Sequence, residues 1–362
     1  MTYKTNLLVH MKSINACLPR FGAEATVDVR TFQLEIRARN RYYRFTPQYA
    51  YIQEGKLHYS PQIREDTDAF IGWLPYFNKR WPLATDKLSF KAYCREKSLP
   101  TPATREVNDD SMRDFIVKQR RSSFGYDIRG PFRDLPSMGS RRLAEDEYCE
   151  AFIEGTIVKA WFWNEKLVSV ETRDMPKITG NGRDSFLQLA SSQMQPLFTH
   201  SLVRSQIEAL ARYQNVQPET VITSGATLLA DFRYGSPIAP GPVESLNVVS
   251  KIRGTEIGRQ LVDAGPLFWR GIPESMRDST LYTVDAIADA SGCVWFLEMN
   301  CNPQLHPDVY FPVLESLFGA AAPVISASPG FAVPPLPPSF AADNAQRPAR
   351  HLSPGPLQSV PA

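Results

Sequence analysis

The chain has 362 residues, of which 43 % are hydrophobic and 22 % are charged. This size and balance exclude a wholly disordered or membrane-embedded protein and leave room for two or three lobes. Lys and Arg number 40 against 38 Asp and Glu, which gives a net charge of +2. We therefore expect neither a nucleic-acid partner nor an acidic membrane, because both require a clustered positive field.

The first part of the chain, up to about Arg80, is predicted to form a small α/β lobe. Strand-like runs at residues 26–29, 32–36 and 49–52 alternate there with charged turns. Lys4 and Lys12 interrupt any apolar run at the start of the chain. No secretory signal is expected, and a cytoplasmic location follows.

A helix is predicted directly after this lobe. Thr85 is of a type that caps helix N-termini, and Asp86 favours the positive end of the helix dipole. The prolines within residues 99–102 end the helix. Lys87 falls in its first turn, where it can present a cation.

The next feature is a buried strand at residues 115–117 followed by a loop. Lys118 begins this loop, and the small residues Ser122, Ser123 and Gly125 give its backbone conformational freedom. Such a loop can place an ammonium group and several backbone N–H groups on a polyphosphate. A lone lysine or a lone glycine loop is more often a solvated surface feature, so the order of these features along the chain is the stronger observation.

The elements between this loop and the C-terminal region are predicted from alternation and apolar periodicity. Residues 150–155 are expected to end a strand, at Gly155. The other expected elements are two hairpins, at 158–163 with 167–171 and at 281–288 with 293–300, and helices near 186–193, 202–213 and 256–263.

The second hairpin carries the polar residues of greatest interest. Glu298 and Asn300 are two positions apart in a strand, so their side chains share one face, while Leu297 and Met299 are expected on the other. With a turn at residues 291–292, Asp285 lies directly opposite Glu298.

Two carboxylates and an amide on one face of an apolar hairpin would repel each other unless a hard cation neutralised them. Magnesium is the expected ion at Asp285, Glu298 and Asn300. The alternative interpretation is that Asp285 is a solvated edge residue and that Glu298 and Asn300 only end a strand. Lys118 and Lys87 make this alternative less attractive, because both can supply cations to a bound phosphate.

The end of the chain differs in composition from the rest. Residues 321–362 hold ten of the 30 prolines. Residues 317–342 carry no charge, but prolines interrupt them and no sustained run of Leu, Ile or Val exists, so a membrane span is not expected. We predict a disordered extension.

Taken together, residues 85–317 resemble the ATP-grasp superfamily, and within it the carboxylate-amine ligases such as the D-alanine:D-alanine ligase, glutathione synthetase, cyanophycin synthetase and ribosomal-protein glutamate ligase branches. The resemblance implies an α/β (α+β) ATP-grasp fold. Its parts would be an N-terminal substrate lobe (1–84), a linker helix with the central lid subdomain (85–157), a C-terminal subdomain with the metal site (158–320) and the Pro-rich tail (321–362).

The resemblance also assigns ligands. The metal signature of the family, Asp followed by Glu-x-Asn-x-x-Pro, matches Asp285, Glu298, Asn300 and Pro303. It implies ATP with Mg²⁺, two ions being expected and Mn²⁺ an alternative. The residues implied for ATP are Lys87, Lys118, Ser122, Ser123, Gly125, Glu150, Phe152, Ile153 and Glu154, the last as a ribose ligand.

Two positions depart from the pattern of the family. Thr283 stands where D-alanine ligases place an arginine that steadies the transition state, so another cation must act. Arg233 is the candidate, and with Lys118 it completes the predicted catalytic set. Asn181 replaces the aspartate usual in the loop of residues 175–189 in related branches.

The function implied is an ATP-dependent ligase that forms a C–N bond between small-molecule substrates, a carboxylate and an amine, on an amino acid or peptide. The reaction would pass through an acyl phosphate and release ADP and phosphate. Two alternatives stay open: a small-molecule kinase using the same nucleotide site, and a nucleotide-binding scaffold whose Pro-rich tail docks to a partner. No nucleic-acid or membrane partner is expected, and a homodimer is left open.

Overall fold

The computed structural model describes most of the chain up to Gly319. The described residues are 7–38, 40–53, 56–106, 111–122, 127–139, 142–194, 200–236, 238 and 247–319. The chain divides into two units, Met1–Ala322 and Pro323–Ala362. The tail predicted to be disordered lies outside the described residues, so that statement stays a prediction. Within the described part, no helix has the length and apolar character needed to cross a membrane.

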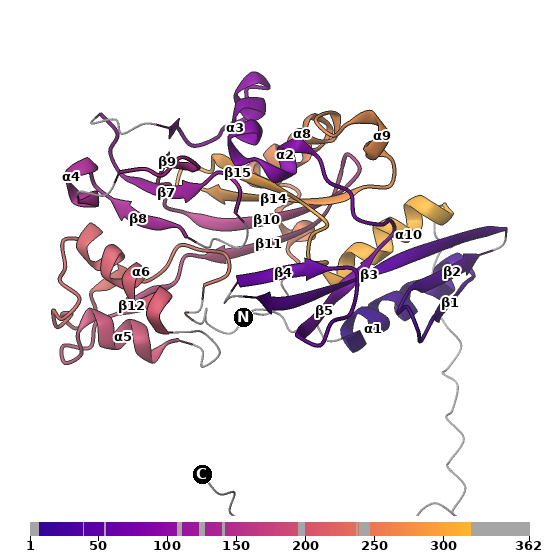
Figure 1. The fold of residues 1–362 in the computed structure, drawn as a ribbon, viewed down its shortest axis with the longest axis horizontal. Coiled ribbons are helices and arrows are strands. Elements are labelled where there is room, and N and C mark those ends of the chain that lie inside the picture. Colours follow the sequence, from indigo (N-terminus) through magenta and orange to yellow (C-terminus); the bar gives the residue numbers. More distant parts are fainter. Residues whose placement is uncertain are drawn as a thin grey trace, which may run out of the picture. The chain divides into compact units, whose positions relative to one another are not determined.

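An antiparallel five-stranded sheet forms the N-terminal lobe (Figure 1). Strands β1 to β4 follow one another in order, and β5 also pairs with β3. The helices α1, η1 and α10 pack on this sheet through a shared apolar cluster. The elements are α1 (Leu7–Cys17), η1 (Leu18–Phe21), β1 (Ala23–Val27), β2 (Leu34–Ala38), β3 (Arg41–Gln53), β4 (Lys56–Ser60), β5 (Thr67–Leu74) and α10 (Tyr310–Phe318).

Sequence patterning does not predict α1. Its buried residues His10, Ile14 and Cys17 are three or four positions apart and therefore share one helical face. Because a histidine lies among them, the apolar period is weak. The strand expected at 49–52 is the buried end of the longer strand β3.

The predicted helix after this lobe is present, but its cap is different. The short helix α2 (Pro82–Thr85) ends at Thr85, and α3 (Lys87–Glu96) begins one residue later. Asp86 is the N-cap of α3, because its Oδ1 accepts hydrogen bonds from the backbone N–H groups of Leu88 at 3.0 Å and Ser89 at 3.1 Å. The predicted capping role of Thr85 is therefore wrong.

A second antiparallel sheet has the strand order β6, β9, β7, β8. The strand expected at 115–117 is β7. The strand expected to end at Gly155 is β9, which ends four residues earlier, at Ala151. The elements of this region are β6 (Thr104–Arg105), β7 (Phe115–Gln119), β8 (Arg129–Phe132), α4 (Leu135–Met138) and β9 (Glu147–Ala151).

The third sheet holds both predicted hairpins, in the antiparallel order β11, β10, β14, β15. Strand β10 (Thr156–Trp163) runs across the boundary predicted at residue 157, and the predicted domain division stays a prediction. The other strands are β11 (Lys166–Asp174), β14 (Leu281–Ala288) and β15 (Val294–Cys301). Helices thus accompany antiparallel sheets, which confirms the predicted α/β (α+β) class.

Helices cover both faces of the third sheet. Side chains of α3 and α8 pack with Val158, Val284 and Met299 in one apolar cluster. Side chains of α5 and α6 pack with Ile157 and Ile287 in another. The remaining elements are β12 (Lys177–Thr179), α5 (Phe186–Ser192), α6 (His200–Tyr213), β13 (Thr227–Leu229), α7 (Val249–Ile252), α8 (Glu256–Arg270), α9 (Glu274–Arg277) and η2 (Pro307–Val309). Of these, β12, α5, α6, α8 and α9 are labelled in Figure 1.

The β14–β15 hairpin contains one extra residue. Near the turn Ala286 pairs with Phe296, whereas the next pair is Asp285 with Glu298, so Leu297 has no opposite residue. This β-bulge shifts the side chain of Leu297 to the other face. Leu297 packs in the cluster of Ile287 rather than in that of Met299, so the prediction that Leu297 and Met299 share a face is wrong.

Candidate active site

The three predicted metal ligands come together on β14 and β15. Asp285 is paired with Glu298, as predicted, and Asn300 is paired with Thr283. The Asn300 Nδ2 donates a hydrogen bond to the Asp285 Oδ2 at 3.0 Å. The structure therefore places both carboxylates and the amide on one patch of the sheet.

These two carboxyl groups are largely removed from water, with 19 % of the Asp285 side chain and 17 % of the Glu298 side chain exposed. Burial and the neighbouring Glu298 raise the pKa of Asp285. Burial opposes ionisation of Glu298 as well, but Lys87, Lys118 and Lys159 outweigh it and lower the pKa of Glu298. The pair thus favours binding either a proton or a cation between its members.

The two predicted phosphate-binding lysines lie against acidic groups of this site. The Lys87 Nζ is 3.3 Å from the Glu298 Oε2 and donates a hydrogen bond to the carbonyl oxygen of Ser122. The Lys118 Nζ lies 3.1 Å from the Glu150 Oε1. Burial lowers the pKa of Lys118, but Glu150 and Glu298 outweigh burial and raise it, so Lys118 remains an ammonium ion.

The loop after Lys118 is only partly described. Ser122 is described and lies at the Lys87 side chain, whereas Ser123 and Gly125, two predicted ATP ligands, lie outside the described residues. The backbone N–H of Lys87 donates to the carbonyl of Arg120 at 3.2 Å, which ties the start of α3 to the end of β7. Lys87 and Lys118 therefore lie where the start of α3 meets the end of β7.

Sequence reasoning misses a third lysine on the same side. The Lys91 Nζ is 2.9 Å from the Glu150 Oε2, and the Tyr148 hydroxyl donates to that oxygen at 3.1 Å. Lys91 is fully buried. Burial opposes ionisation of Glu150, but Lys118 and Lys91 outweigh it and lower the pKa of Glu150 to about 2. Burial lowers the pKa of Lys91 to about 8.

The segment predicted to hold adenine follows Glu150 directly. Phe152 packs edge-on against Phe232, with ring centroids 5.2 Å apart, and Ile153 joins the same apolar cluster. Glu154, the predicted ribose ligand, is exposed. The assignment of these three residues to the nucleotide stays a prediction.

A fourth lysine, also missed, reaches the metal pair from β10. Lys159 is directly opposite Asp285 in the sheet, and its Nζ lies 2.8 Å from the Asp285 Oδ1. The signal in the sequence is a single lysine within the apolar strand of residues 156–163. A lysine is rarely buried in a strand unless it is paired with an acidic group. The partner of Lys159 is Asp285, a predicted metal ligand.

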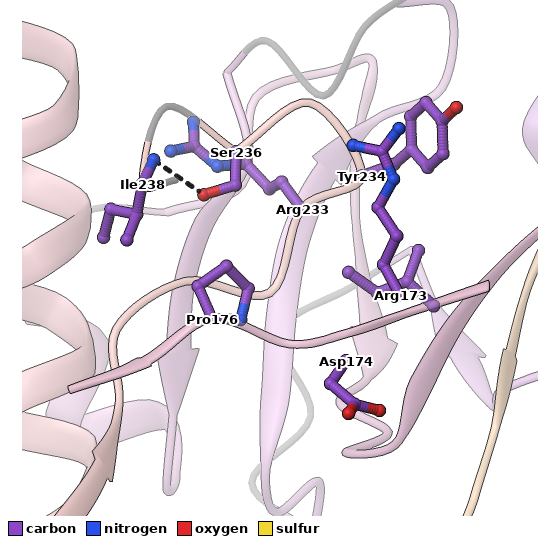
Figure 2. A pocket seen from close by; sticks show the side chains of 8 residues that line it. Arg173, Asp174, Pro176, Arg233, Tyr234, Ser236 and Ile238 are labelled. Atoms are coloured by element: carbon purple, nitrogen blue, oxygen red, sulfur yellow. Dashed lines mark hydrogen bonds between the residues drawn. The ribbon is translucent and has the colours of Figure 1, made fainter. Parts of the chain in front are cut away.

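Arg233, the predicted catalytic cation, is bound by its neighbour. Its Nε and Nη2 each donate to Asp231, at 3.0 Å to Oδ1 and 3.0 Å to Oδ2. Figure 2 shows the Arg233 guanidinium beside Ser236, whereas that of Arg173 lies beside the Tyr234 ring, in the wall of one small hollow. The catalytic role of Arg233 stays a prediction.

The two positions that depart from the family pattern have different surroundings. Thr283 is fully buried, in the middle of the third sheet. The Asn181 Oδ1 accepts hydrogen bonds from the backbone N–H groups of Arg183 and Asp184, both at 2.9 Å. Asn181 therefore orders its own turn, which an aspartate could also do.

The donor set fits a hard cation. Asp285 and Glu298 supply carboxylate oxygens and Asn300 an amide oxygen, the ligands that Mg²⁺ and Mn²⁺ prefer. Among the described residues, no group of three or more His, Cys, Asp or Glu side chains has the arrangement of a metal site. In magnesium sites with one or two carboxylates, substrate phosphates and water complete the coordination.

No family model and no curated protein matches the chain. Solved structures do match. A bifunctional glutathione synthetase from Pasteurella multocida is 11 % identical, with 87 % of this chain and 44 % of that chain covered and a TM-score of 0.43. A D-alanine–D-alanine ligase from Bacillus anthracis is 12 % identical over 65 % of this chain and 66 % of that chain, with a TM-score of 0.34.

An L-amino acid ligase from Bacillus licheniformis is 10 % identical over 66 % of this chain and 48 % of that chain, with a TM-score of 0.31. The chain spans about half the length of several of these structures, with 44 % of the first and 48 % of the last covered. At such identities and TM-scores, the chemistry of the site has to be inferred from the side chains of this chain.

Proposed function

We propose that the chain is an ATP-dependent ligase of the ATP-grasp type, which joins a carboxylate to an amine through an acyl phosphate. One observation carries this proposal: lysines from three separate elements converge on one pair of facing carboxylates. The lysines are Lys87 at the start of α3, Lys118 at the end of β7 and Lys159 in β10.

Such an arrangement suits transfer of the terminal phosphoryl group of ATP. In this reaction charge spreads over the phosphoryl oxygens, so positioned cations supply most of the catalysis. A bound magnesium ion would neutralise the phosphates and align the reacting oxygens, held by Asp285, Glu298 and Asn300. Lys118 and Lys87 would bind the phosphate oxygens, at the expense of their present contacts with Glu150 and Glu298.

The first step forms a bond between a carboxylate oxygen of the substrate and the γ-phosphorus, while the bond to the β-γ bridging oxygen breaks and ADP leaves. In the second step the amine nitrogen attacks the carbonyl carbon, the C–N bond forms and phosphate departs. Lys159, which contacts Asp285, is placed to neutralise the oxygens of the transferred group. We propose a role for it beside that predicted for Arg233.

Product analysis tests the proposal. Purified protein with Mg-ATP is incubated with pools of amino acids and short peptides, and products are identified by mass. A ligase releases ADP and free phosphate and forms a product that has lost water relative to its substrates. A product that retains the phosphate would instead show a kinase, and binding of ATP without turnover would favour the scaffold alternative. The cytoplasmic location and the homodimer stay predictions.

A further inference from the structure

Four charged side chains form one row across the third sheet. The strand register places Glu171 opposite Lys159, Lys159 opposite Asp285, and Asp285 opposite Glu298. Directly opposite residues of antiparallel strands have side chains on the same face, with Cα atoms about 4.5 to 5.5 Å apart. Glu171 therefore lies on the face of the metal carboxylates, separated from Asp285 only by Lys159.

The two oxygens of Glu171 have different surroundings. Oε2 accepts hydrogen bonds from the Tyr234 hydroxyl at 2.5 Å and from the Arg173 Nη2 at 3.0 Å. For Oε1, the described residues offer no hydrogen-bond donor, and the His306 Nε2 lies 4.0 Å away. Glu171 as a residue is only 3 % exposed, and its Oε1 has unused acceptor capacity with respect to the described residues.

His306 does not satisfy this oxygen. Its Nδ1 accepts a hydrogen bond from the backbone N–H of Asp308 at 3.1 Å, which leaves Nε2 to carry the proton of the neutral ring. Burial lowers the pKa of His306, so the ring is neutral near pH 7. A neutral ring 4.0 Å away does not bond Oε1, and the charge of the carboxylate is balanced through its other oxygen, by Arg173 at 3.0 Å from Oε2.

The walls around this oxygen are aromatic. The Tyr234 ring has the Lys159 Nζ 4.8 Å from its centroid, and the Trp161 and His306 rings pack edge to face at 5.7 Å. Aromatic faces beside a carboxylate are a favourable environment for an organic cation, because the ring quadrupole attracts positive charge. The site thus offers a carboxylate oxygen without a hydrogen-bond donor among the described residues, beside aromatic rings, and in the sheet only Lys159 separates Glu171 from Asp285.

We propose that Oε1 of Glu171 binds the ammonium group of the attacking amine and takes one of its protons. This inference rests on the proposed ligase function. The row then orders the reactants: the phosphoryl group lies above Asp285 and Glu298, the acyl carbonyl near Lys159 and the amine at Glu171. Transfer of one N–H proton to Oε1 frees the nitrogen lone pair, which attacks the carbonyl carbon, and the second proton leaves with the departing phosphate.

Two nucleophiles of different charge test this role. Near neutral pH methylamine is a cation, whereas hydroxylamine is uncharged and attacks acyl phosphates without losing a proton first. The wild-type protein and the Glu171→Gln variant are incubated with Mg-ATP, a pool of amino acids and short peptides as carboxylates, and either nucleophile. Methylamide, hydroxamate and ADP are measured. Glu165→Gln, an exposed glutamate in the turn of the same hairpin, is the matched control.

We expect Glu171→Gln to lower methylamide formation by about 10²-fold or more, the usual contribution of a positioned base, and to keep hydroxamate formation within about 3-fold. Retained hydroxamate also shows that the variant folds and activates the carboxylate. A wild-type protein that makes hydroxamate but no methylamide, a variant with unchanged methylamide formation, or a variant that loses both products would each overturn the amine site. A wild-type protein that releases no ADP with either nucleophile would instead refute the ligase function itself.

Discussion

Two groups of buried charge meet in the candidate site, and their composition is opposite. Glu150 is one carboxylate between two lysines, Lys91 and Lys118, and its pKa is lowered to about 2. Asp285 faces a second carboxylate, Glu298, and its pKa is raised by burial and by that neighbour. In the first group two lysines bind one carboxylate, whereas in the second each carboxylate has one lysine in contact, Lys159 for Asp285 and Lys87 for Glu298.

The difference teaches where external ions are expected. A carboxylate saturated by buried donors positions its partners and has little capacity for a ligand. A pair of carboxylates side by side gains from a divalent cation that replaces a proton or an ammonium group. We therefore interpret Glu150 as an anchor for Lys118, and the pair of Asp285 and Glu298 as the place of the metal.

The largest effect is expected at the metal pair. Asp285→Asn or Glu298→Gln removes an anionic ligand, and turnover is expected to fall by about 10³-fold, the upper end for loss of one preorganised group. ADP release by the purified variants measures this. Asp263→Asn, an exposed carboxylate of α8, should leave the rate unchanged. Undiminished ADP release from Glu298→Gln would contradict the interpretation that the metal binds at Asp285 and Glu298 and not at Glu150.

The next effect concerns stability. Lys91→Met leaves Glu150 with one lysine, and breaking a buried ion pair costs about 3 to 5 kcal/mol. We expect the free energy of unfolding in urea to fall by about this amount. The double variant Lys91→Met with Glu150→Gln should recover part of the loss, because the uncompensated charge is gone. If the single variant is as stable as the wild type, Glu150 is not a saturated anchor.

The acid limb of the stability curve tests the same anchor without removing a lysine. The pKa of Glu150 is lowered from 4.5 to about 2 in the folded chain. The contribution of Glu150 to the free energy of unfolding is therefore fully present above pH 4.5 and is lost as the pH falls towards 2. It amounts to about 3 kcal/mol, at about 1.36 kcal/mol per pKa unit. Urea midpoints should fall more steeply over this range in the wild type than in Glu150→Gln. Parallel curves would contradict the shift.

A smaller effect separates the two candidate catalytic cations. Lys159→Met is expected to lower kcat by about 10²-fold, because a cation beside Asp285 is lost. Arg233→Lys should lower kcat less, since Asp231 already binds the guanidinium group on two nitrogens. Steady-state kinetics of the two variants decides between them. A greater loss in Arg233→Lys would support the role assigned to Arg233 from the sequence.

The smallest effect is expected at the C-terminus. Removal of the residues after Ala322 deletes the second unit, which contains none of the predicted site residues. We expect an unchanged rate of ADP release and an unchanged melting temperature. A truncated protein that is insoluble or inactive would show that the Pro-rich segment contributes to the fold or to the site.

Sequence reasoning predicts best where the carboxylates of the site come from one local motif. Asp285, Glu298 and Asn300 belong to a single hairpin, so the sequence brings them close together, and the bulge at Leu297 sets the register in which Asp285 faces Glu298. Lys87 and Lys118 follow from their places at a helix start and a strand end. The predicted fold class rests on the resemblance of residues 85–317 to a known family, and strand and helix patterns alone predict only the small N-terminal lobe.

The residues missed are those whose partners are far along the chain. Lys91 contacts Glu150, and Lys159 contacts Asp285, through pairings that no local pattern encodes. Glu171 belongs to the row only because three strand registers coincide. The sequence predicts Thr85 as the N-cap instead of Asp86. Threonine and aspartate are both common at N-caps, and the short helix α2, which ends at Thr85, is not apparent from the sequence.

The extra residue at Leu297 has a consequence for comparing sequences. Because one residue of β15 is absorbed by the bulge, the number of residues between Asp285 and Glu298 does not by itself determine whether they face each other. A relative lacking the residue at 297, and with it the bulge, would keep the two carboxylates opposed at a spacing one shorter. A search pattern with fixed spacing would pass over such a chain, although its metal pair would have the same geometry.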